Sequence, residues 1–342
     1  MIRCSIRCLA PLMKGALSAA LGMLLAVLCA GVLAEESKEE AQFTGVIGKR
    51  LSVYAHADET SGVLGTVETG TVVDVYEKMR TYTRIDYNGA TGYVLTKYIE
   101  RVQRKNPLDG PMPGTTLLYG MGTLTRDVSF KPEGYKYAIT LTAGSCLAVQ
   151  KVSGTKAYFS YRVEPELQTV PLDALEMVEF TPWADAQPGD LICAFSTFYS
   201  SSQNSWTNVN RLKNIDLACE RLDGVTIRAG GTFSFNEICA PYSEENGYFE
   251  APILSGVSDT GYGGGVCQVA TTVYNNVLRT PMWIVDHHWH GQGGTNYISG
   301  GYDATVSDKW NLAFENWLPY DLRLMMKAQD GMMTAAFYRA DE

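Results

Sequence analysis

Residues 261–276, GYGGGVCQVATTVYNN, decide the fold of the C-terminal part of this chain. From Cys267 onward, apolar residues such as Ala270 and Val273 recur at helical spacing, which predicts a helix. The glycines at 263–265 allow backbone conformations that are closed to other residues, and they allow close approach to another group. The sequence therefore predicts a Gly-rich loop that delivers Cys267 to the first turn of a helix.

A cysteine at a helix N-terminus has the setting of a nucleophile, because unpaired N–H groups and the helix dipole favour the thiolate. A cysteine nucleophile also needs a base and, often, a polar group that orients the base. His290 and Asp303 follow in the chain, and we predict them on or beside successive strands. Papain-like and transglutaminase-like enzymes have the same order, which is an analogy only. A buried small residue at a tight turn gives the same local pattern, so catalysis by Cys267, His290 and Asp303 is a hypothesis.

The N-terminus has the pattern of a secretory signal peptide at 1–34. Three basic residues precede an uncharged stretch at 15–34, rich in Leu, Ala and Val, which predicts cleavage after Ala34. The stretch is also long enough to span a bilayer, so a retained leader is the one membrane contact that we consider. A charged tether follows at 35–42. We therefore expect a secreted protein on the extracytoplasmic side of the cell envelope.

The composition limits which partners and cofactors are expected for this protein. The net charge is −9, and loss of a leader with three cations and no acidic residue leaves about −12, so no nucleic acid is expected as a partner. Eight cysteines become five without the leader, an odd number that leaves at least one thiol unpaired, and we assign that thiol to Cys267. There is no CxxC spacing. On a strand, His288 and His290 would share a face that His287 does not, so we predict no metal and no other cofactor.

Short β-strands dominate the residues after the tether. Residues alternate at 72–76 and 83–87, and Asn88-Gly89 between these two runs is a strong hairpin signal. With the Gly turn at Gly70 and the closing GYV at 92–94, the pattern resembles the bacterial SH3-like domain, a small β-barrel common in cell-wall proteins. The resemblance covers 43–104. It implies a wall-targeting module that binds peptidoglycan or peptide, with a spacer that binds nothing as the alternative.

The middle of the chain echoes this first module. Residues 106–116 are rich in Pro and Gly and indicate a linker. Beyond it, Gly144 falls where Gly70 did, and similar strand patterns follow, which indicates an internal duplication. We therefore predict a second SH3-like barrel at 117–182.

The last domain is predicted at 186–340, after a composition shift near Asp185. A strand is expected at 191–195 and a helix at about 208–222, which Gly224 ends. After the Cys267 helix, strands are expected at these residues: 282–286, 296–298, 303–306, 310–314 and 322–327. The chain is thus expected to be multidomain, with small all-β SH3-like barrels followed by an α+β domain.

Several sequence blocks stand in one order in this last domain. They are Asn210-Arg211, FSFN at 233–236, GGGVCQ at 263–268 and DATV at 303–306. Together they resemble the VanW family, which is named from a vancomycin-resistance cluster and occurs in secreted, often wall-binding proteins of Gram-positive bacteria. The resemblance covers about 188–328 and matches His290 to the histidine of the family. Ala270 stands where the family commonly has Ser.

The same domain offers residues that could hold a substrate. The candidates are Asn210, Arg211, Asn214, Gln268, Gly264 and Gly265. Arg211 could grip a carboxylate with two hydrogen bonds, or pair with an acidic neighbour on the surface. Gln268 or the backbone amides of the Gly-rich loop could stabilise an oxyanion.

These observations predict a cell-envelope protein of the VanW type that binds or acts on peptidoglycan. One hypothesis is a cysteine-dependent acyl transferase or peptidase acting on stem peptides, whose amide bonds and carboxylates suit this chemistry. The alternative is a non-catalytic wall protein in which the same cleft holds a peptide or glycan. A third possibility is an envelope scaffold that works through the SH3-like domains alone. The sequence by itself does not decide whether the last domain is an enzyme.

Overall fold

The computed structural model describes residues 39–342 apart from a few short stretches. The exceptions are Arg80, 113–114, Leu117, 164–165, 254–259, 291–294 and Glu342. The predicted signal peptide and residues 35–38 of the charged tether lie outside the described residues. Residues Ala41–Glu342 form one compact unit. In the part of the chain that is described, no helix has the length and apolar character needed to span a membrane.

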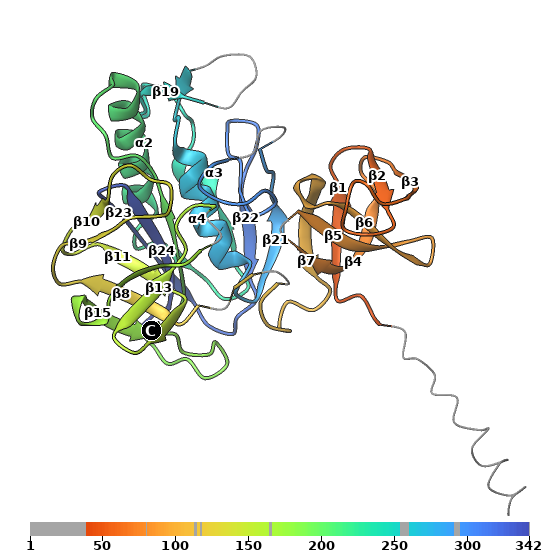
Figure 1. Cartoon of the computed structure of the whole chain (residues 1–342), viewed down its shortest axis with the longest axis horizontal. Helices are drawn as coiled ribbons and strands as arrows, with labels where there is room; N and C mark the ends of the chain where they lie inside the picture. The colour runs from red at the N-terminus through yellow and green to blue at the C-terminus, as the bar shows by residue number, and fades with distance from the viewer. Residues whose placement is uncertain are drawn as a thin grey trace, which may run out of the picture. The chain divides into compact units, whose positions relative to one another are not determined.

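The N-terminal domain is a seven-stranded antiparallel sheet in the order β3-β2-β6-β5-β4-β1-β7, drawn in orange in Figure 1. Its elements are β1 (Phe43–Ile47), β2 (Leu51–Tyr54), β3 (Val63–Val67), β4 (Val72–Lys78), β5 (Tyr82–Tyr87), β6 (Ala90–Leu95), the 3₁₀ helix η1 (Thr96–Tyr98) and β7 (Ile99–Arg104). Alternate residues of β1 and β2 are buried, because side chains point to opposite faces along a strand.

The hairpin predicted at Asn88-Gly89 is confirmed. It joins β5 to β6, and both residues have positive φ (55° and 81°), as a type I′ turn requires. The prediction of a closed barrel is wrong for this domain. In the described residues, β3 and β7 are the two ends of the sheet and do not pair with each other. Val63 and Leu64 on β3 stay exposed, so this edge is not covered by another strand.

The middle region is rich in strands, as expected, but its strands are short and belong to three small sheets. They are β8 (Gly120–Leu124), β9 (Val128–Phe130), β10 (Ile139–Leu141), β11 (Cys146–Val149), β12 (Lys151–Ser153), β13 (Lys156–Phe159), β14 (Gln168–Pro171) and β15 (Leu175–Glu179), with η2 (Leu172–Ala174) before β15. Phe130 and Phe159 pack with Phe198, which belongs to the next domain, so the two regions share a core. A second SH3-like barrel at 117–182 stays a prediction.

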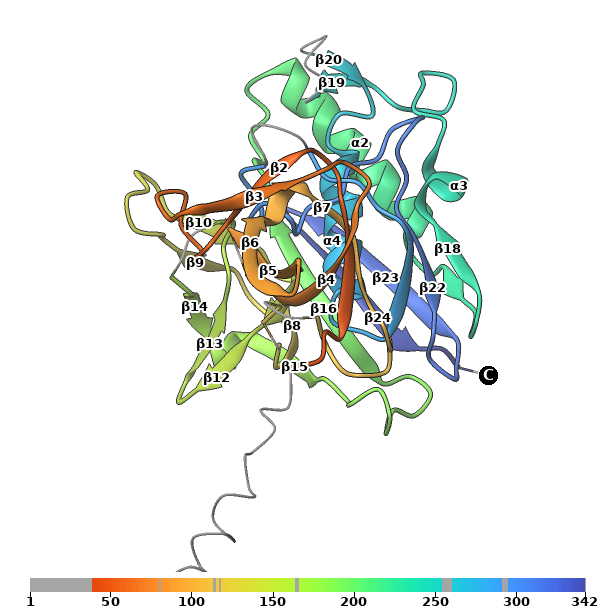
Figure 2. The same cartoon turned by 90° about the vertical axis from the view of Figure 1, so that its right-hand side faces the viewer.

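The C-terminal domain combines helices with three sheets in its described residues, one of which is the β19-β20 pair. A four-stranded sheet has the order β16-β24-β23-β17, and a smaller one has the order β18-β22-β21; β16, β24 and β23 lie next to one another in Figure 2. The strands are β16 (Leu191–Phe198), β17 (Thr226–Ile227), β18 (Thr232–Ser234), β19 (Glu250–Pro252), β20 (Thr260–Tyr262), β21 (Met282–Asp286), β22 (Ala313–Asn316), β23 (Leu322–Gln329) and β24 (Met332–Arg339). The helices are α2 (Trp206–Leu222), α3 (Phe235–Cys239) and α4 (Val266–Val277). The α+β expectation is confirmed.

Helix α4 lies at the centre of this domain, packed on β16, β24 and α2. Eleven of its twelve residues are buried, and Cys267 is the exception. Two of its buried polar side chains bond to the neighbouring sheet: Thr272 bonds to Thr197 on β16, and Asn276 donates to the Ala335 carbonyl on β24. A helix buried on every face positions Cys267 rigidly, because its neighbours on all sides are packed.

The strands expected at 296–298 and 303–306 are wrong, and the strand expected at 310–314 begins only at Ala313. The reason is visible at 303–306. Ala304 exchanges hydrogen bonds with the Thr271 hydroxyl, Thr305 N–H donates to the His288 carbonyl, and Val306 bonds to the Cys267 sulfur. Side chains of α4 thus satisfy backbone groups that a neighbouring strand would otherwise pair.

Candidate functional site around Cys267

The Gly-rich loop brings the start of α4 against the neighbouring backbone. Gly265 is the N-cap with φ 108°, a conformation that favours glycine. A Cβ on Gly264 would lie 2.6 Å from the Pro252 carbonyl oxygen, so only glycine fits there. Buried Asn214 holds the loop, since its Nδ2 donates to the Gly264 oxygen (3.1 Å) and to the Phe249 oxygen (2.9 Å). Gly264, Gly265 and Asn214 therefore build the site.

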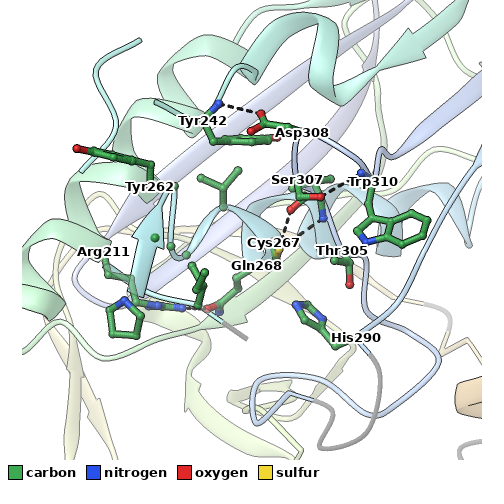
Figure 3. A pocket seen from close by; sticks show the side chains of 18 of the residues that line it. Arg211, Tyr242, Tyr262, Cys267, Gln268, His290, Thr305, Ser307, Asp308 and Trp310 are labelled. Atoms are coloured by element: carbon green, nitrogen blue, oxygen red, sulfur yellow. Dashed lines mark hydrogen bonds between the residues drawn. The ribbon is translucent and has the colours of Figure 1, made fainter. Parts of the chain in front are cut away.

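The sulfur of Cys267 faces the backbone of Val306. The thiol donates to the Val306 oxygen at 3.3 Å, and the Val306 amide lies 3.5 Å from the sulfur (Figure 3). The backbone N–H of Cys267, in the first turn of α4, has no acceptor among the described residues. This N–H is free to bind an oxygen atom of a ligand placed at the sulfur.

Thr271 connects α4 to the segment that carries Asp303. Its hydroxyl donates to the Cys267 carbonyl at 2.8 Å and accepts from the Ala304 N–H at 2.9 Å. Thr271 was not among the residues predicted from the sequence. The signal was its position four residues after Cys267, which places both side chains on one face of a helix.

His290 and Asp303 form a buried pair. Nδ1 of His290 donates to Oδ2 of Asp303 at 2.8 Å, and the backbone N–H of His290 donates to the same oxygen at 2.7 Å. Their side chains are only 8% and 2% exposed. Figure 3 shows the imidazole directed toward Cys267. The structure therefore brings the three predicted residues together, although His290 and Asp303 lie on irregular segments and not on strands.

The electrostatics of the pair favour a protonated histidine. Burial lowers the pKa of His290, but hydrogen bonds to Asp303 and Cys267 outweigh it and raise the pKa to about 10. Burial likewise raises the pKa of Asp303, but the hydrogen bonds from His290 reverse this and bring it below its usual value. Asp303 thus stays ionised and orients a charged imidazole.

The predicted substrate residues divide into two groups. Asn210 donates to the Glu250 oxygen at 2.9 Å and, like Asn214, does not line the pocket. Arg211 and Gln268 do line it, and Arg211 Nη2 donates to Gln268 Oε1 at 2.6 Å. The amide nitrogen of Gln268 donates to Thr197 Oγ1 and to the Phe198 oxygen. Gln268 therefore positions Arg211, and its amide hydrogens point away from an oxyanion.

A pocket of about 540 Å³ opens above the sulfur. Its lining, part of which Figure 3 labels, consists of Arg211, Tyr242, Pro252, Ile253, Gly261–Gly265, Val266, Cys267, Gln268, His290, Tyr297, Thr305–Asp308 and Trp310. Tyr262 and Trp310 are partly exposed in this lining. This volume accommodates a small peptide segment or a similar ligand.

The other two histidines of the HHWH run have separate partners. His288 Nε2 lies 3.0 Å from Asp286 Oδ1, and its ring packs on Trp310. His287 is buried, with Nε2 2.8 Å from the Asp303 carbonyl oxygen. Strand β21 ends at Asp286, so strand alternation does not govern these residues. Within the described ranges, no three His, Cys, Asp or Glu side chains are grouped to hold a metal.

Comparison with known proteins agrees with this architecture. Residues 210–338 match the family model described as VanW like protein. The chain carries a VanW-like domain. Residues 49–100 match the bacterial SH3 domain, within the N-terminal sheet. The VanW-like domain contains all the residues of the site that were predicted from sequence, including Arg211, Cys267, His290 and Asp303.

Two curated relatives are similar to part of the chain. One is the uncharacterized protein YoaR of Bacillus subtilis (strain 168), 32% identical over 151 residues, which are 43% of this chain and 47% of YoaR. The other is the vancomycin B-type resistance protein VanW of Enterococcus faecalis (strain ATCC 700802 / V583), 30% identical over 107 residues, 30% of this chain and 38% of that protein. The chain spans less than half the length of each of these relatives.

Proposed function

We propose that this protein works in the extracytoplasmic cell envelope and that its VanW-like domain is a cysteine-dependent amide-bond transferase or hydrolase acting on peptidoglycan stem peptides. The observation that carries the proposal is that Cys267 and His290 line one pocket and that Nδ1 of His290 is bonded to the buried carboxylate of Asp303. A nucleophile, a base and an orienting carboxylate are the set that acyl transfer requires.

The chemistry begins with transfer of the thiol proton of Cys267 to Nε2 of His290. With a pKa of about 10, His290 keeps the transferred proton at neutral pH. The sulfur then attacks the carbonyl carbon of an amide, forming an S–C bond while the C=O electrons move to oxygen. The backbone N–H of Cys267 is placed to stabilise that oxyanion. Collapse breaks the C–N bond, and the leaving amine takes the proton from His290.

The resulting thioester is resolved by a second nucleophile. An amine gives a transferase and water gives a hydrolase; in both cases His290 accepts the proton of the attacking group and returns it to the sulfur. Asp303 keeps Nδ1 of the imidazole protonated and Nε2 directed at the reaction throughout.

Arg211 supports a substrate that carries a carboxylate. Gln268 fixes one end of the guanidinium at the pocket wall, and one Nη is the only donor of Arg211 with a partner among the described residues. The remaining N–H groups can form a bidentate pair with a carboxylate. Stem peptides contain amide bonds close to carboxylates, which fits this arrangement.

The test is mass spectrometry of purified muropeptides incubated with residues 35–342. The comparison variants are Cys267→Ala and Cys146→Ala, because Cys146 is the other half-buried free cysteine. We expect a new product or a covalent adduct with the wild type and with Cys146→Ala, and neither with Cys267→Ala. Intact muropeptides with no adduct in any sample would refute the proposed enzymatic activity. Retention of the muropeptides without turnover would instead favour a binding pocket with Tyr262 and Trp310 in its wall.

A further inference from the structure

A lysine of the SH3-like domain lies buried beneath the site of the VanW-like domain. Lys78, the last residue of β4, is 1% exposed. Its ammonium donates to the Gly301 carbonyl at 2.5 Å, across a sequence separation of 223 residues. It also lies 4.3 Å from the centre of the Tyr302 ring, and the Tyr302 hydroxyl donates back to the Lys78 carbonyl. Burying a lysine is costly, so these contacts at the site have to compensate for it.

The atoms that Lys78 touches belong to the turn that presents Asp303. Gly301 has φ 83°, and its N–H donates to Oδ1 of Asp303 at 3.3 Å. Asp303 therefore accepts a hydrogen bond from Gly301 at Oδ1 and two hydrogen bonds from His290 at Oδ2. Lys78 bonds to the carbonyl of Gly301, and the N–H of Gly301 bonds to Asp303. A shift of Lys78 therefore changes the geometry of the hydrogen bonds between Asp303 and His290.

Three aromatic or imidazole side chains complete the surroundings of Lys78. We name Lys78, Tyr274, His287 and Tyr302 the support cluster. His287 stacks on Tyr274 with ring centres 4.0 Å apart, and Tyr274 lies 5.9 Å from the Lys78 ammonium. His287 also contacts the Asp303 carbonyl oxygen at 2.8 Å. Every member of the support cluster is at least nine-tenths buried, so the cluster is a packed floor under Asp303.

The charges around the ammonium are few. Burial lowers the pKa of Lys78 to about 7, Asp303 acts against this, and Arg279 adds to it. Burial also lowers the pKa of His287, which leaves this imidazole neutral beside Lys78. Asp303 is thus the one anion that favours the charged lysine among the groups that act on it.

We propose that Lys78 is a positioning residue of the Cys267 site, so that the SH3-like domain completes the acyl-transfer machinery of the VanW-like domain. This inference rests on the proposed function. It assigns the N-terminal domain a part in the chemistry besides any wall targeting. The effect acts through Gly301 and Asp303, and Lys78 itself touches no reacting atom.

The first measurement is the rate of alkylation of Cys267 by iodoacetamide as a function of pH, with the adduct located by peptide mass spectrometry. Lys78→Met keeps the length of the side chain but removes the charge, and Lys78→Arg keeps the charge. We expect Lys78→Met to slow alkylation at pH 7 by about tenfold and to change its pH profile, because small misplacements of catalytic groups have effects of this size. Lys78→Arg should retain most of the wild-type rate.

Two controls separate positioning from loss of stability. Lys105→Met removes an exposed lysine of the same domain that pairs with Asp74. Met112→Ala loosens the contact between the linker and the end of α4, where the Met112 N–H donates to Leu278, without touching the ammonium. Met112→Ala should lower the Tm, and both controls should keep the wild-type alkylation profile. If Lys78→Met does not fold, Lys78→Gln replaces it.

A second readout does not depend on thiol reactivity. The Nδ1 proton of His290, held by Asp303, should give a low-field NMR signal in the wild type and in Lys78→Arg that is lost in Lys78→Met. A folded Lys78→Met protein with the wild-type signal and alkylation profile overturns the inference. If wild-type Cys267 is alkylated no faster than in His290→Gln, the proposed function fails, and the NMR signal still decides the role of Lys78.

Discussion

Replacing Asp303 by Asn should lower the pKa of His290 substantially. The change keeps the size of the side chain and removes the charge that accepts two hydrogen bonds from His290 at 2.7 and 2.8 Å. A rise from 6.5 to about 10 corresponds to about 5 kcal/mol in favour of the imidazolium, shared between Asp303 and Cys267. A hydrogen bond to a charged group contributes about 1.5–3 kcal/mol, so Asp303→Asn should lower the pKa of His290 by about one to two pH units.

The assay is an NMR titration of protein labelled at histidine, with His290 assigned from the signal missing in His290→Gln. Asp308→Asn is the matched control, because Asp308 is an exposed carboxylate of the same pocket that contacts the Tyr242 amide and not His290. The control should leave the titration unchanged. A His290 that titrates near 6.5 in the wild type, or that does not respond to Asp303→Asn, would refute the reasoning.

The same pair predicts a pH dependence of stability. The pKa of His290 is higher in the folded protein than in the unfolded chain, so its contribution is complete below pH 6.5 and is lost as the pH rises through about 10. Asp303→Asn should therefore lower the free energy of unfolding most near pH 6, and the difference from the wild type should narrow toward pH 10. Urea denaturation at both pH values measures this, and a difference that does not change with pH would contradict it.

Further predictions concern the Gly-rich loop and the pocket wall. Asn214→Ala removes three hydrogen bonds to Phe249 and Gly264 and should lower the free energy of unfolding, measured by urea denaturation, by about 2–4 kcal/mol. A loss below about 1 kcal/mol would show that the Gly-rich loop keeps its conformation without these bonds. Gly264→Ala places a Cβ 2.6 Å from the Pro252 oxygen and should lower both the Tm and the alkylation rate of Cys267; a wild-type rate would mean that the loop has room. Arg211→Lys keeps the charge but loses the bidentate geometry, so it should raise the KM for a carboxylate-bearing substrate more than it lowers kcat, and an unchanged KM would remove Arg211 from substrate binding.

The sequence was most informative where a local pattern has a local cause. The hairpin at Asn88-Gly89 follows from two positive φ angles, and α4 follows from its glycines and its apolar spacing. Both depend on contacts between residues that are near in sequence, which propensity and periodicity describe well. The order of Cys267, His290 and Asp303 also suggested which side chains meet.

The sequence predicted the strand at 303–306 incorrectly because the competing partner is distant. An extended segment usually pairs with a neighbouring strand. Here its backbone N–H groups instead bond to the Thr271 hydroxyl and the Cys267 sulfur on α4. That exchange turns Asp303 toward His290 and away from a ladder. Period-2 reasoning does not contain this information, since it ignores hydrogen bonds from a helix side chain to a backbone.

The sequence by itself thus determined the helix that carries Cys267 and the two kinds of domain, and it predicted that His290 and Asp303 would lie near this cysteine. The tertiary structure decided that Asn214 builds the loop, that Gln268 serves Arg211, and that Lys78 of the N-terminal domain lies under Asp303. The physical reason is that each of these roles is a pairing of buried polar groups far apart in sequence. Such pairings are selected by the cost of leaving a buried donor or acceptor unsatisfied once the chain is folded, and this cost has no local signature.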